Sequence, residues 1–413
     1  MTLTANVFCD EAIEPFARRK VVNRKVWNPY FLHLSIAGYG LERLLVRIAQ
    51  VAPLAESCPP KLYGGTERVV HFLTEELVRQ GHDVTLFASG DSETSAKLIA
   101  CVPNALRLSS DVKDFTPYHI AMVEQVRQRL DDFDIVHFHI DLFHCPAVRT
   151  WACPTLTTLH GRLDLPDLAP FYTIFGDIPL VSISDNQRRP LPPVNWVDTV
   201  FHGLPANLLP YQARGGDYLA FLGRISPEKR PDRAIEIAVR TGLPLKMAAK
   251  IDRVDLEYWH NEIEPLVNAH DNVEYIGEVD ETGKAELLGN AAALLFPIDW
   301  PEPFGLVMIE AMSCGTPVVA WDNGSVPEVL DNGVTGRIVS SVEEAAHAVF
   351  EVMRYNRAIV RARFEERFTV SRMANDYLRV YQDLINGGLV HETSIGKLRS
   401  GMALPEIMGT VAA

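Results

Sequence analysis

Short apolar segments recur along the chain from residue 46 onward, separated by stretches whose apolar residues have helical spacing. One such stretch covers residues 66–80 and ends at Gly81. The segments expected to form strands are V-R-I-A-Q-V-A-P (residues 46–53), D-V-T-L-F-A-S, I-V-H-F-H, T-L-T-T-L-H-G, P-L-V-S-I-S, D-Y-L-A-F-L-G, V-E-Y-I-G-E-V, A-L-L-F-P-I, P-V-V-A-W-D and G-R-I-V-S. Short apolar strands that alternate with helices predict parallel sheets covered on both faces. These strands are too many for one ordinary doubly wound sheet, so we expect two sheets.

The turn-rich segment L-P-Y-Q-A-R-G-G-D (residues 209–217) is the expected linker between the two sheets. We therefore expect one domain over residues 46–210 and a second over residues 211–369. Residues 370–386 should form a closing helix, and residues 387–413 a tail. Residues 1–45 break the pattern, because basic residues precede an apolar patch but acidic residues come first and no A-x-A site follows. We expect a loosely packed N-terminal extension, or a start site placed too far upstream.

Composition narrows the class of protein. The chain has 413 residues, of which 47% are hydrophobic and 22% charged, as in a folded globular protein. Its formal net charge of −14 argues against a general nucleic-acid binder and against membrane association through bulk charge. The six cysteines are scattered without a C-x-x-C pair, so a zinc site or a disulfide framework is not expected. No apolar run approaches the ~18 residues of a membrane span, and we expect a cytoplasmic protein.

The segment E-P-F-G-L-V-M-I-E (residues 302–310) is the main candidate for ligand binding. It follows an apolar strand and turns into an apolar helix that Gly315 should end. Glu302 would lie on the loop and Glu310 over one turn inside the helix. The backbone N–H groups near Phe304, Gly305 and Leu306 would be free at the positive end of the helix, which makes these three residues and Glu310 candidates for binding the donor. Two carboxylates with open N–H donors between them suit a nucleotide sugar, which has hydroxyls at both ends and phosphate between them. The alternative is two solvated glutamates that flank a core helix.

Three other loops should lie beyond the carboxyl ends of strands, where ligands of open α/β sheets bind. In Y-G-G-T-E, Gly64 and Gly65 allow close approach of the backbone, and Thr66 can cap the following helix, although an ordinary turn explains them equally well. In G-R-I-S-P-E-K-R-P, Arg224 and Lys229 can neutralise a diphosphate, although both residue types are common on surfaces.

The third loop ends the segment T-L-T-T-L-H-G-R, where His160 emerges from an apolar strand beside Gly161. Taken alone, one such histidine is more often structural than functional. His137 and His139 have H-x-H spacing without a third ligand, so we interpret them as strand-edge residues and not as a metal site. The D-D-F-D segment (residues 131–134) precedes a strand and indicates a helix end, not a metal-binding donor loop.

Together, E-P-F-G-L-V-M-I-E-A-M-S-C-G-T-P-V-V-A, F-L-G-R-I-S-P-E-K-R-P and L-Y-G-G-T-E-R-V-V resemble the retaining glycosyltransferases of family 4, over about residues 46–386. The resemblance implies the α/β GT-B fold, in which two Rossmann-like, doubly wound parallel-sheet domains face each other across a cleft. It implies transfer of a hexose from a nucleotide-diphosphate sugar to an acceptor hydroxyl with retention at the anomeric carbon. By this resemblance, Glu302 would contact the donor sugar and Glu310 the ribose hydroxyls.

The same resemblance implies that Arg224 and Lys229 bind the diphosphate, that Gly64 and Gly65 lie against the phosphates, and that His160 contacts the sugar near the reacting carbon. The two cations would then do what a metal ion does elsewhere, so we expect no metal and no cofactor besides the nucleotide-sugar co-substrate. The segment V-S-R-M-A-N-D-Y-L-R-V-Y-Q-D-L-I resembles the family's closing helix, which crosses back onto the first domain.

Two alternatives stay open from the sequence. A nucleotide-sugar epimerase on the same fold would need acidic residues placed to move protons on the sugar, and a non-catalytic sugar-nucleotide binding module would have lost Arg224, Lys229 or Glu302. The acceptor is not readable and could be a saccharide, a lipid-linked sugar or a small molecule. Its contacts should come from the first-domain loops at residues 53–62, 141–148 and 162–175.

Overall fold

The structure of the protein, a computed structural model, describes residues 45–61, 64–107 and 109–391. The expectations for the N-terminal extension before Leu45, for Tyr63 and for the chain beyond residue 391 lie outside the described residues. Within those residues, no helix combines the length and the apolar character that crossing a membrane requires.

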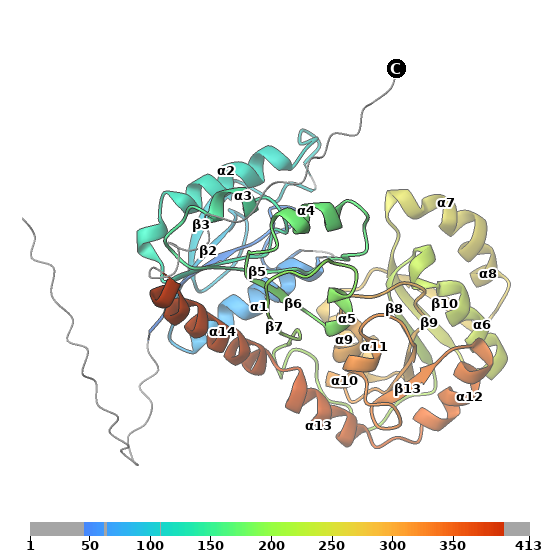
Figure 1. The fold of residues 1–413 in the computed structure, drawn as a ribbon. Helices are drawn as coiled ribbons and strands as arrows, with labels where there is room; N and C mark the ends of the chain where they lie inside the picture. Colours follow the sequence, from blue (N-terminus) through green and yellow to red (C-terminus); the bar gives the residue numbers. More distant parts are fainter. Residues whose placement is uncertain (1–44, 62–63, 108, 392–413) are drawn as a thin grey trace, which may run out of the picture. The chain divides into compact units, whose positions relative to one another are not determined.

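The first sheet has seven parallel strands in the order β3-β2-β1-β4-β5-β6-β7 (Figure 1). Its strands are β1 (Arg47–Val51), β2 (Asp83–Ser89), β3 (Lys97–Val102), β4 (Ile135–Phe138), β5 (Thr155–Thr158), β6 (Leu180–Ser182) and β7 (Trp196–Thr199). The strand order reverses between the neighbours β1 and β4. Ligands of open parallel sheets bind beyond the carboxyl ends of the strands at such a reversal.

The second sheet has six parallel strands in the order β10-β9-β8-β11-β12-β13, with its reversal between β8 and β11. Its strands are β8 (Leu219–Arg224), β9 (Leu245–Lys250), β10 (Val273–Gly277), β11 (Ala293–Phe296), β12 (Val318–Trp321) and β13 (Gly336–Val339). The prediction of two parallel α/β sheets is therefore confirmed. Every residue of β11 and β12 is buried, which explains why these strands are unbroken apolar runs.

Helices connect most successive strands, and others follow the last strand, β13. They are α1 (Gly65–Arg79), α2 (Thr116–Arg127), α3 (Cys145–Val148), α4 (Leu168–Ile174), α5 (Asp185–Arg188), α6 (Pro231–Thr241), α7 (Leu256–Tyr258), α8 (Glu264–Asn268), α9 (Glu281–Gly289), α10 (Leu306–Ser313), α11 (Val326–Val329), α12 (Val342–Val352), α13 (Arg357–Arg367) and α14 (Val370–His391). The D-D-F-D segment overlaps a short 3-10 helix at Leu130–Asp132, directly before β4, so its residues end a helical turn.

Three strands lie where the sequence pattern predicts none. β3 and β7 are the edge strands of the first sheet, and both carry partly exposed residues, so their sequences K-L-I-A-C-V and W-V-D-T mix polar and apolar positions. β9 lies inside the second sheet, but its sequence L-K-M-A-A-K carries a lysine at each end of a short apolar core. The apolar pattern is weak in all three because part of each strand meets solvent or a ligand pocket.

The last helix returns to the first sheet. The chain crosses at a bridge between Leu204 and Thr369, and Gly203 permits it, because a Cβ there would lie 2.4 Å from the Thr369 carbonyl oxygen. From there α14 (dark red in Figure 1) runs beside α1. Arg379 on α14 pairs with Asp198 of β7 at 3.0 Å. The helix continues to His391, beyond the end at residue 386 and into the tail that the sequence predicted.

Candidate active site

A pocket of about 620 Å³ lies where the loops at the carboxyl ends of both sheets come together. The first-sheet side comes from the loops that follow β1, β5, β6 and β7, and the second-sheet side from the loops that follow β8, β9, β10 and β11. The residues used below that line it are Lys61, Gly64, Gly65, Thr66, Arg68, His160, Arg162, His202, Lys229, Glu281, Lys284, Trp300, Glu302, Phe304, Gly305, Leu306 and Glu310. The pocket therefore contains every residue that the sequence singled out for the site except Arg224.

The loop that carries Glu302 has a fixed backbone. Gly305 is the N-cap of α10 with a φ of +80°, and a Cβ there would lie 2.8 Å from the Met308 methyl group. Gly324 packs against the loop so closely that its Cβ would lie 2.3 Å from the backbone N and O atoms of Glu302. Ser325 donates from its backbone N–H to the Glu302 carbonyl at 2.9 Å and from its hydroxyl to the Phe304 carbonyl at 2.7 Å. These contacts explain why glycines stand at positions 305 and 324, where a side chain would be strained or would clash.

Glu302 is paired with Lys229 across the pocket. Their side chains are 12% and 14% exposed, so the pair is largely withdrawn from water. The Lys229 ammonium also lies over the Trp300 ring, 4.8 Å from its centroid. A cation that is paired with a partly buried carboxylate has lost much of its hydration. An anionic ligand that enters the pocket can take the place of this carboxylate as the partner of the cation.

A second set of charges lies at Glu310, whose side chain is 7% exposed. Lys284 on α9 pairs with Glu310 at 2.7 Å and lies 3.1 Å from Glu281. Glu281 also pairs with Arg68 on α1, and burial lowers the pKa of Arg68. Sequence reasoning did not identify Lys284, Glu281 or Arg68. Their signal is weak, because single charged residues near the starts of amphipathic helices are common.

Arg224 is the one predicted site residue that does not line the pocket. It is the last residue of β8, and its guanidinium is paired with Glu228 and lies 3.6 Å from Asp252. Lys229, five positions further, is in the short 3-10 helix Pro227–Lys229 that leads into α6. The two cations therefore differ in their position in this structure. Lys229 faces the pocket, whereas Arg224 lies beside the pocket and is paired with acidic side chains.

The glycine-rich loop that contains Gly64 and Gly65 lines the pocket with backbone atoms. Gly64, and not Thr66, is the N-cap of α1, and no side chain caps this helix, so the prediction of a Thr66 cap is wrong. A Cβ on Gly64 would lie 2.8 Å from Pro60, which shows that packing within the loop requires a glycine there. Gly65 is exposed and has open space around it apart from Leu306 of the second-sheet side. Gly65 thus leaves room for a ligand between the two sides of the pocket.

His160 follows β5 and lines the pocket, and burial lowers its pKa to about 3. Its ring stacks on His202, with the centroids 5.2 Å apart and the planes 17° apart. His160 Nε2 lies 2.8 Å from His139 Nδ1. The pocket therefore presents a neutral imidazole whose second nitrogen has no partner among the described residues.

His137 and His139 are not at an exposed strand edge, which corrects the interpretation from their spacing. β4 lies between β1 and β5, and the two side chains are 0% and 2% exposed. All four of their ring nitrogens contact hydrogen-bonding side chains of the protein. Alternate residues of a strand share one face. The H-x-H spacing therefore places these two rings side by side, with their centroids 4.0 Å apart.

Among the described residues, no group of three or more His, Cys, Asp or Glu side chains is arranged to bind a metal ion. Whether transfer proceeds without a metal ion, as the cations of the site led us to expect, stays a prediction.

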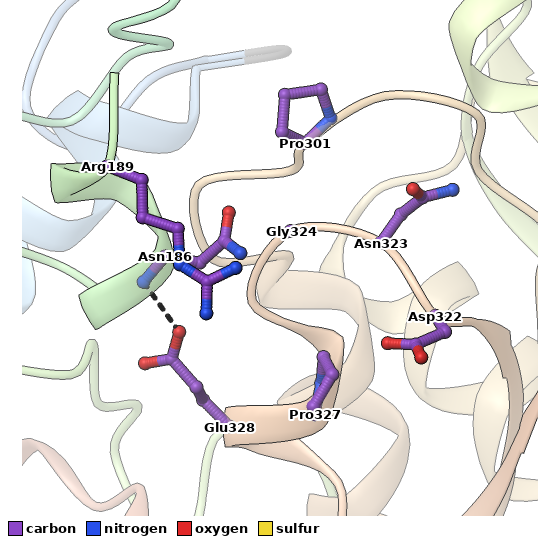
Figure 2. A pocket seen from close by; sticks show the side chains of 8 residues that line it. All are labelled: Asn186, Arg189, Pro301, Asp322, Asn323, Gly324, Pro327 and Glu328. Carbon is purple, nitrogen blue, oxygen red and sulfur yellow. Dashed lines mark hydrogen bonds between the residues drawn. The ribbon is translucent and has the colours of Figure 1, made fainter. Parts of the chain in front are cut away.

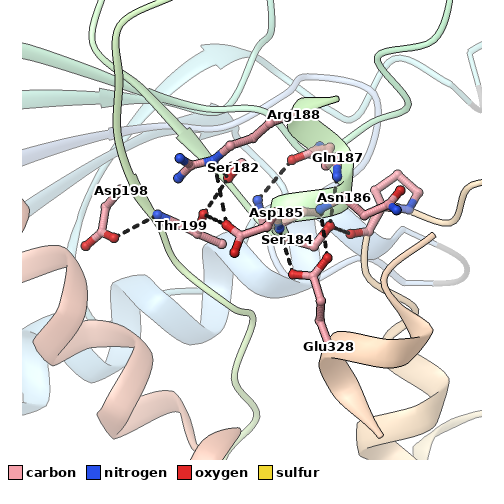
Figure 3. Close-up of polar contacts among 11 residues, drawn as sticks. Ser182, Ser184, Asp185, Asn186, Gln187, Arg188, Asp198, Thr199 and Glu328 are labelled. Atoms are coloured by element: carbon pink, nitrogen blue, oxygen red, sulfur yellow. Dashed lines mark hydrogen bonds and ion pairs between the residues drawn. The ribbon is translucent and has the colours of Figure 1, made fainter. Parts of the chain in front are cut away.

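The helix α5 connects the loops of the two sheets (Figure 3). Ser184, its N-cap, donates to the carbonyl of Pro303 at 2.6 Å, next to Glu302. Gln187 donates to the carbonyls of Leu159 and Gly161, on either side of His160, at 2.9 and 2.8 Å. Glu328 of α11 accepts from the backbone N–H groups of Asp185 and Asn186 at 2.7 Å each. One short helix thus fixes the backbone beside both His160 and Glu302.

A smaller pocket of about 420 Å³ lies at the same junction (Figure 2). It is lined by Asn186, Arg189, Pro301, Asp322, Asn323, Gly324, Pro327 and Glu328. None of the residues that the sequence singled out lies there. Pro301 and Gly324, which lie against Glu302, form part of the wall of this smaller pocket.

Two family models match this chain. The model described as Glycosyltransferase Family 4 matches residues 63–201, and the model described as Glycosyl transferases group 1 matches residues 212–367. The first range contains β2–β7 and the second contains β8–β13, so each model corresponds to one of the two sheets.

Characterised relatives agree with this match. The chain is 26% identical over 383 residues to phosphatidyl-myo-inositol mannosyltransferase of Mycobacterium leprae, covering 83% of this chain and 98% of the relative. It is 25% identical over 351 residues to glycogen synthase of Mycobacterium tuberculosis, covering 71% of this chain and 84% of the relative. Among solved structures, AviGT4, a glycosyltransferase involved in avilamycin A biosynthesis, has a TM-score of 0.65 at 24% identity over 83% of this chain and 98% of its own.

Another solved structure, Anabaena HepE in complex with UDP and glucose, has a TM-score of 0.64 at 16% identity, over 82% of this chain and all of its own. The likeness to these solved structures shows the GT-B fold. With both family models matched, the chain belongs to the group 1, family 4 glycosyltransferases, enzymes that transfer a sugar from a nucleotide sugar.

Proposed function

We propose that this enzyme transfers a hexose with retention at the anomeric carbon and without a metal ion, and that the diphosphate of the donor binds between Lys229 and the N-terminus of α10. The observation that carries the proposal is the partly buried Lys229–Glu302 pair at the start of this helix. No acceptor for the backbone N–H groups of Gly305 and Leu306 is found among the described residues. A cation and free N–H donors beside a helix N-terminus form an anion-binding site.

Binding of the donor would exchange the partners of the ion pair. When a diphosphate reaches Lys229, the ammonium neutralises the phosphate charge, and Glu302 is released to accept hydrogen bonds from sugar hydroxyls. Lys284 and Glu310 would respond in the same way to the ribose, since Glu310 can accept from two vicinal hydroxyls. The attraction of Lys229 for phosphate grows as negative charge develops on the leaving group, so it stabilises the transition state more than the bound donor.

The distribution of carboxylates supports a front-face route. No carboxylate lies among the described pocket residues that the first sheet contributes, and His160 is a weak base because its pKa is about 3. The acceptor hydroxyl would therefore give its proton to the departing phosphate oxygen. The bond between the anomeric carbon and that oxygen breaks while the new glycosidic bond forms on the same face, which gives retention.

Arg224 would act only after a change of partner, because it is bound to Glu228 and Asp252 in this structure. Acceptor contacts would come from the first-sheet side, where Lys61 and Arg162 line the pocket. The relatives act on acceptors as different as a phosphatidylinositol and a glucan, judged by their names, so the acceptor of this chain would be a hydroxyl compound bound by these variable loops.

The test is to incubate the enzyme with a panel of nucleotide sugars, first without acceptor and then with candidate acceptors. We expect slow donor hydrolysis with one donor class and a product whose anomeric configuration, read by proton NMR, equals that of the donor. A product of inverted configuration would overturn the retaining assignment. Release of a free epimerised sugar without any transfer product would favour the epimerase alternative.

A further inference from the structure

A continuous series of hydrogen bonds joins α14 to the pocket through the interior of the first sheet. His160 Nε2 lies 2.8 Å from His139 Nδ1, and His139 Nε2 lies 2.8 Å from Gln50 Oε1. Gln50 Nε2 lies 3.0 Å from the hydroxyl of Tyr381, which lies 2.7 Å from His137 Nδ1. We call this series the buried array; its members are Gln50, His137, His139, Thr158, His160, Tyr377 and Tyr381. It gives His160 an indirect connection to the helix that closes the fold.

Gln50 sets the direction of the bonds toward the pocket. Its Oε1 atom can only accept, so His139 must donate to it from Nε2. A neutral imidazole carries one N–H, so His139 Nδ1 is an acceptor. His160 therefore donates from its own Nε2 to His139.

The bonds on the other side of Gln50 run in the same sense. The amide nitrogen of Gln50 donates to the Tyr381 oxygen, and the Tyr381 hydroxyl is then free to donate to His137 Nδ1. His137 in turn donates from Nε2 to Thr158 Oγ1 at 2.8 Å. The Thr158 hydroxyl can donate to the oxygen of Tyr377 at 2.9 Å. In this direction His137 and His139 each donate one hydrogen bond and accept one, which requires that both are neutral.

The surroundings keep these histidines neutral. Gln50, His137 and Tyr381 are 0% exposed and His139 is 2% exposed. Burial is the first cause that lowers the pKa of His137, His139 and His160. His160 Nδ1 is itself buried, and it has no hydrogen-bond partner among the described residues. An imidazole with its proton on Nε2 leaves Nδ1 as an open acceptor.

We propose that Gln50 is a positioning residue that fixes His160 as its neutral Nε2–H tautomer, so that His160 offers the substrate a hydrogen-bond acceptor and no donor. This rests on the proposed function and on a contact between His160 and the donor sugar, which the resemblance to the family implies. A sugar hydroxyl that donates to Nδ1 completes the hydrogen bonds of the array. Turning the Gln50 amide by half a rotation would reverse every bond and would make Nδ1 a donor, so the amide orientation decides which groups His160 accepts.

The first test reads the tautomers directly, without any substrate. The imidazoles of the full-length protein are labelled with nitrogen-15, and the signals of His139 and His160 among the 13 histidines are assigned with the variants His139→Gln and His160→Gln. At pH 7 we expect a proton on Nε2 and none on Nδ1 for both residues. A proton on His160 Nδ1, or a doubly protonated ring, would overturn the proposal while leaving the proposed function untouched.

The second test is Gln50→Glu, which keeps the side-chain shape. A carboxylate beside His139 Nε2 favours the imidazolium, whose Nδ1–H would then donate to His160 and move the His160 proton to Nδ1. We expect kcat/KM to fall about tenfold or more at pH 7, and to recover as the pH rises through the raised pKa of His139. The Kd for the nucleoside diphosphate alone should change less than about twofold, since the array does not touch the second sheet.

The matched control is Gln50→Met, which has a similar length and no charge. It interrupts the buried array without changing the proton count of His139, so any loss of activity should be independent of pH. If Gln50→Glu shows the same pH-independent loss as Gln50→Met, Gln50 only packs, and the proposal is wrong. If Gln50→Glu does not fold, the tautomers of the wild-type protein still decide the matter.

Discussion

The side chains behind His160 are neutral and bonded to one another, whereas those around Glu302 are charged and paired. The members of the buried array hydrogen-bond to one another, and neither His137 nor His139 can take up a proton without losing one of these bonds. At the other side of the pocket, Lys229–Glu302 and Lys284–Glu310 are ion pairs with 7–14% exposed side chains. Buried ion pairs contribute little net stability but cost much when one partner is removed.

This difference indicates that the neutral and the charged regions of the pocket have different roles. The neutral region has no spare charge to give to a ligand, so under the proposed function it would determine the shape and the hydrogen-bond polarity of the sugar site. The charged region can exchange an internal partner for a phosphate or a hydroxyl, so it would supply binding energy and neutralise the leaving group. Helix α5 contacts the backbone of both regions, through Gln187 beside His160 and Ser184 beside Glu302 (Figure 3).

The largest effect is expected from Lys229→Ala. The variant removes the cation from the proposed diphosphate site and leaves Glu302 buried and unpaired, so kcat/KM should fall by the equivalent of about 2–5 kcal/mol. Arg224→Ala should also lower kcat/KM, but less, because Arg224 is bound beside the pocket. Steady-state kinetics with a saturating acceptor measure both, and the exposed Lys113→Ala is the control. If Lys229→Ala keeps a near-normal kcat/KM, Lys229 does not bind the diphosphate of the donor as proposed.

The next effect separates the two glutamates of the charged region. In the proposed function Glu302 faces the sugar as charge develops at the anomeric carbon, so Glu302→Ala should mainly lower kcat, by about tenfold to a hundredfold. Glu310 would contact a part of the donor that does not react, so Glu310→Ala should mainly raise the donor KM. Calorimetric titration with the nucleoside diphosphate alone completes the comparison. Equal affinity of wild type and Glu310→Ala for this ligand would show that the two ends of the donor are assigned wrongly.

A smaller effect should appear in the acid stability of the first sheet. His144 is buried, stacks on Phe138 and lies 2.6 Å from Thr157 Oγ1, and burial lowers its pKa to about 3. Between this value and the ordinary histidine pKa of about 6.5, the unfolded chain binds one more proton than the native chain. The contribution of His144 to the free energy of unfolding therefore has its full value above about pH 6.5. Below this pH the contribution declines by about 1.4 kcal/mol per pH unit.

His144→Gln should remove that share of the pH dependence. Urea unfolding at pH 7 and pH 5.5 measures it, with the exposed His260→Gln as the matched control. The His144 variant is expected to lose less stability than wild type on acidification, whatever its stability at pH 7. An unchanged difference between the two pH values would mean that His144 titrates normally in the native protein.

The smallest effect is expected from removal of metal ions. If Lys229 and the N–H groups of α10 neutralise the diphosphate, exhaustive EDTA treatment should leave the rate of transfer unchanged within error. The measurement is the initial rate before and after treatment, with readdition of Mg²⁺ or Mn²⁺. A rate that collapses with EDTA and returns with the added ion would contradict the metal-independent part of the proposal.

The sequence by itself determined the local features. Unbroken apolar runs such as A-L-L-F predicted buried parallel strands, because strands covered on both faces have no polar side to show. The loop and helix at residues 302–310 were readable because their signals, proline, glycine and helical spacing, lie within a few residues of each other. The strands β3 and β7 were not readable because they lie at the edges of the first sheet, and β9 was not readable because two lysines interrupt its apolar pattern.

Only the tertiary structure decided which of these residues meet. Lys229 and Glu302 are 73 residues apart, and His139 and Gln50 are 89 residues apart. Their contacts depend on β8 lying beside β11 and on β1 lying beside β4, an order of strands that local spacing does not encode. For the same reason the sequence could name His160 and yet give no sign of Gln50, Lys284 or Tyr381. A side chain acquires such a partner only when the sheets have formed and α14 has packed onto the first of them.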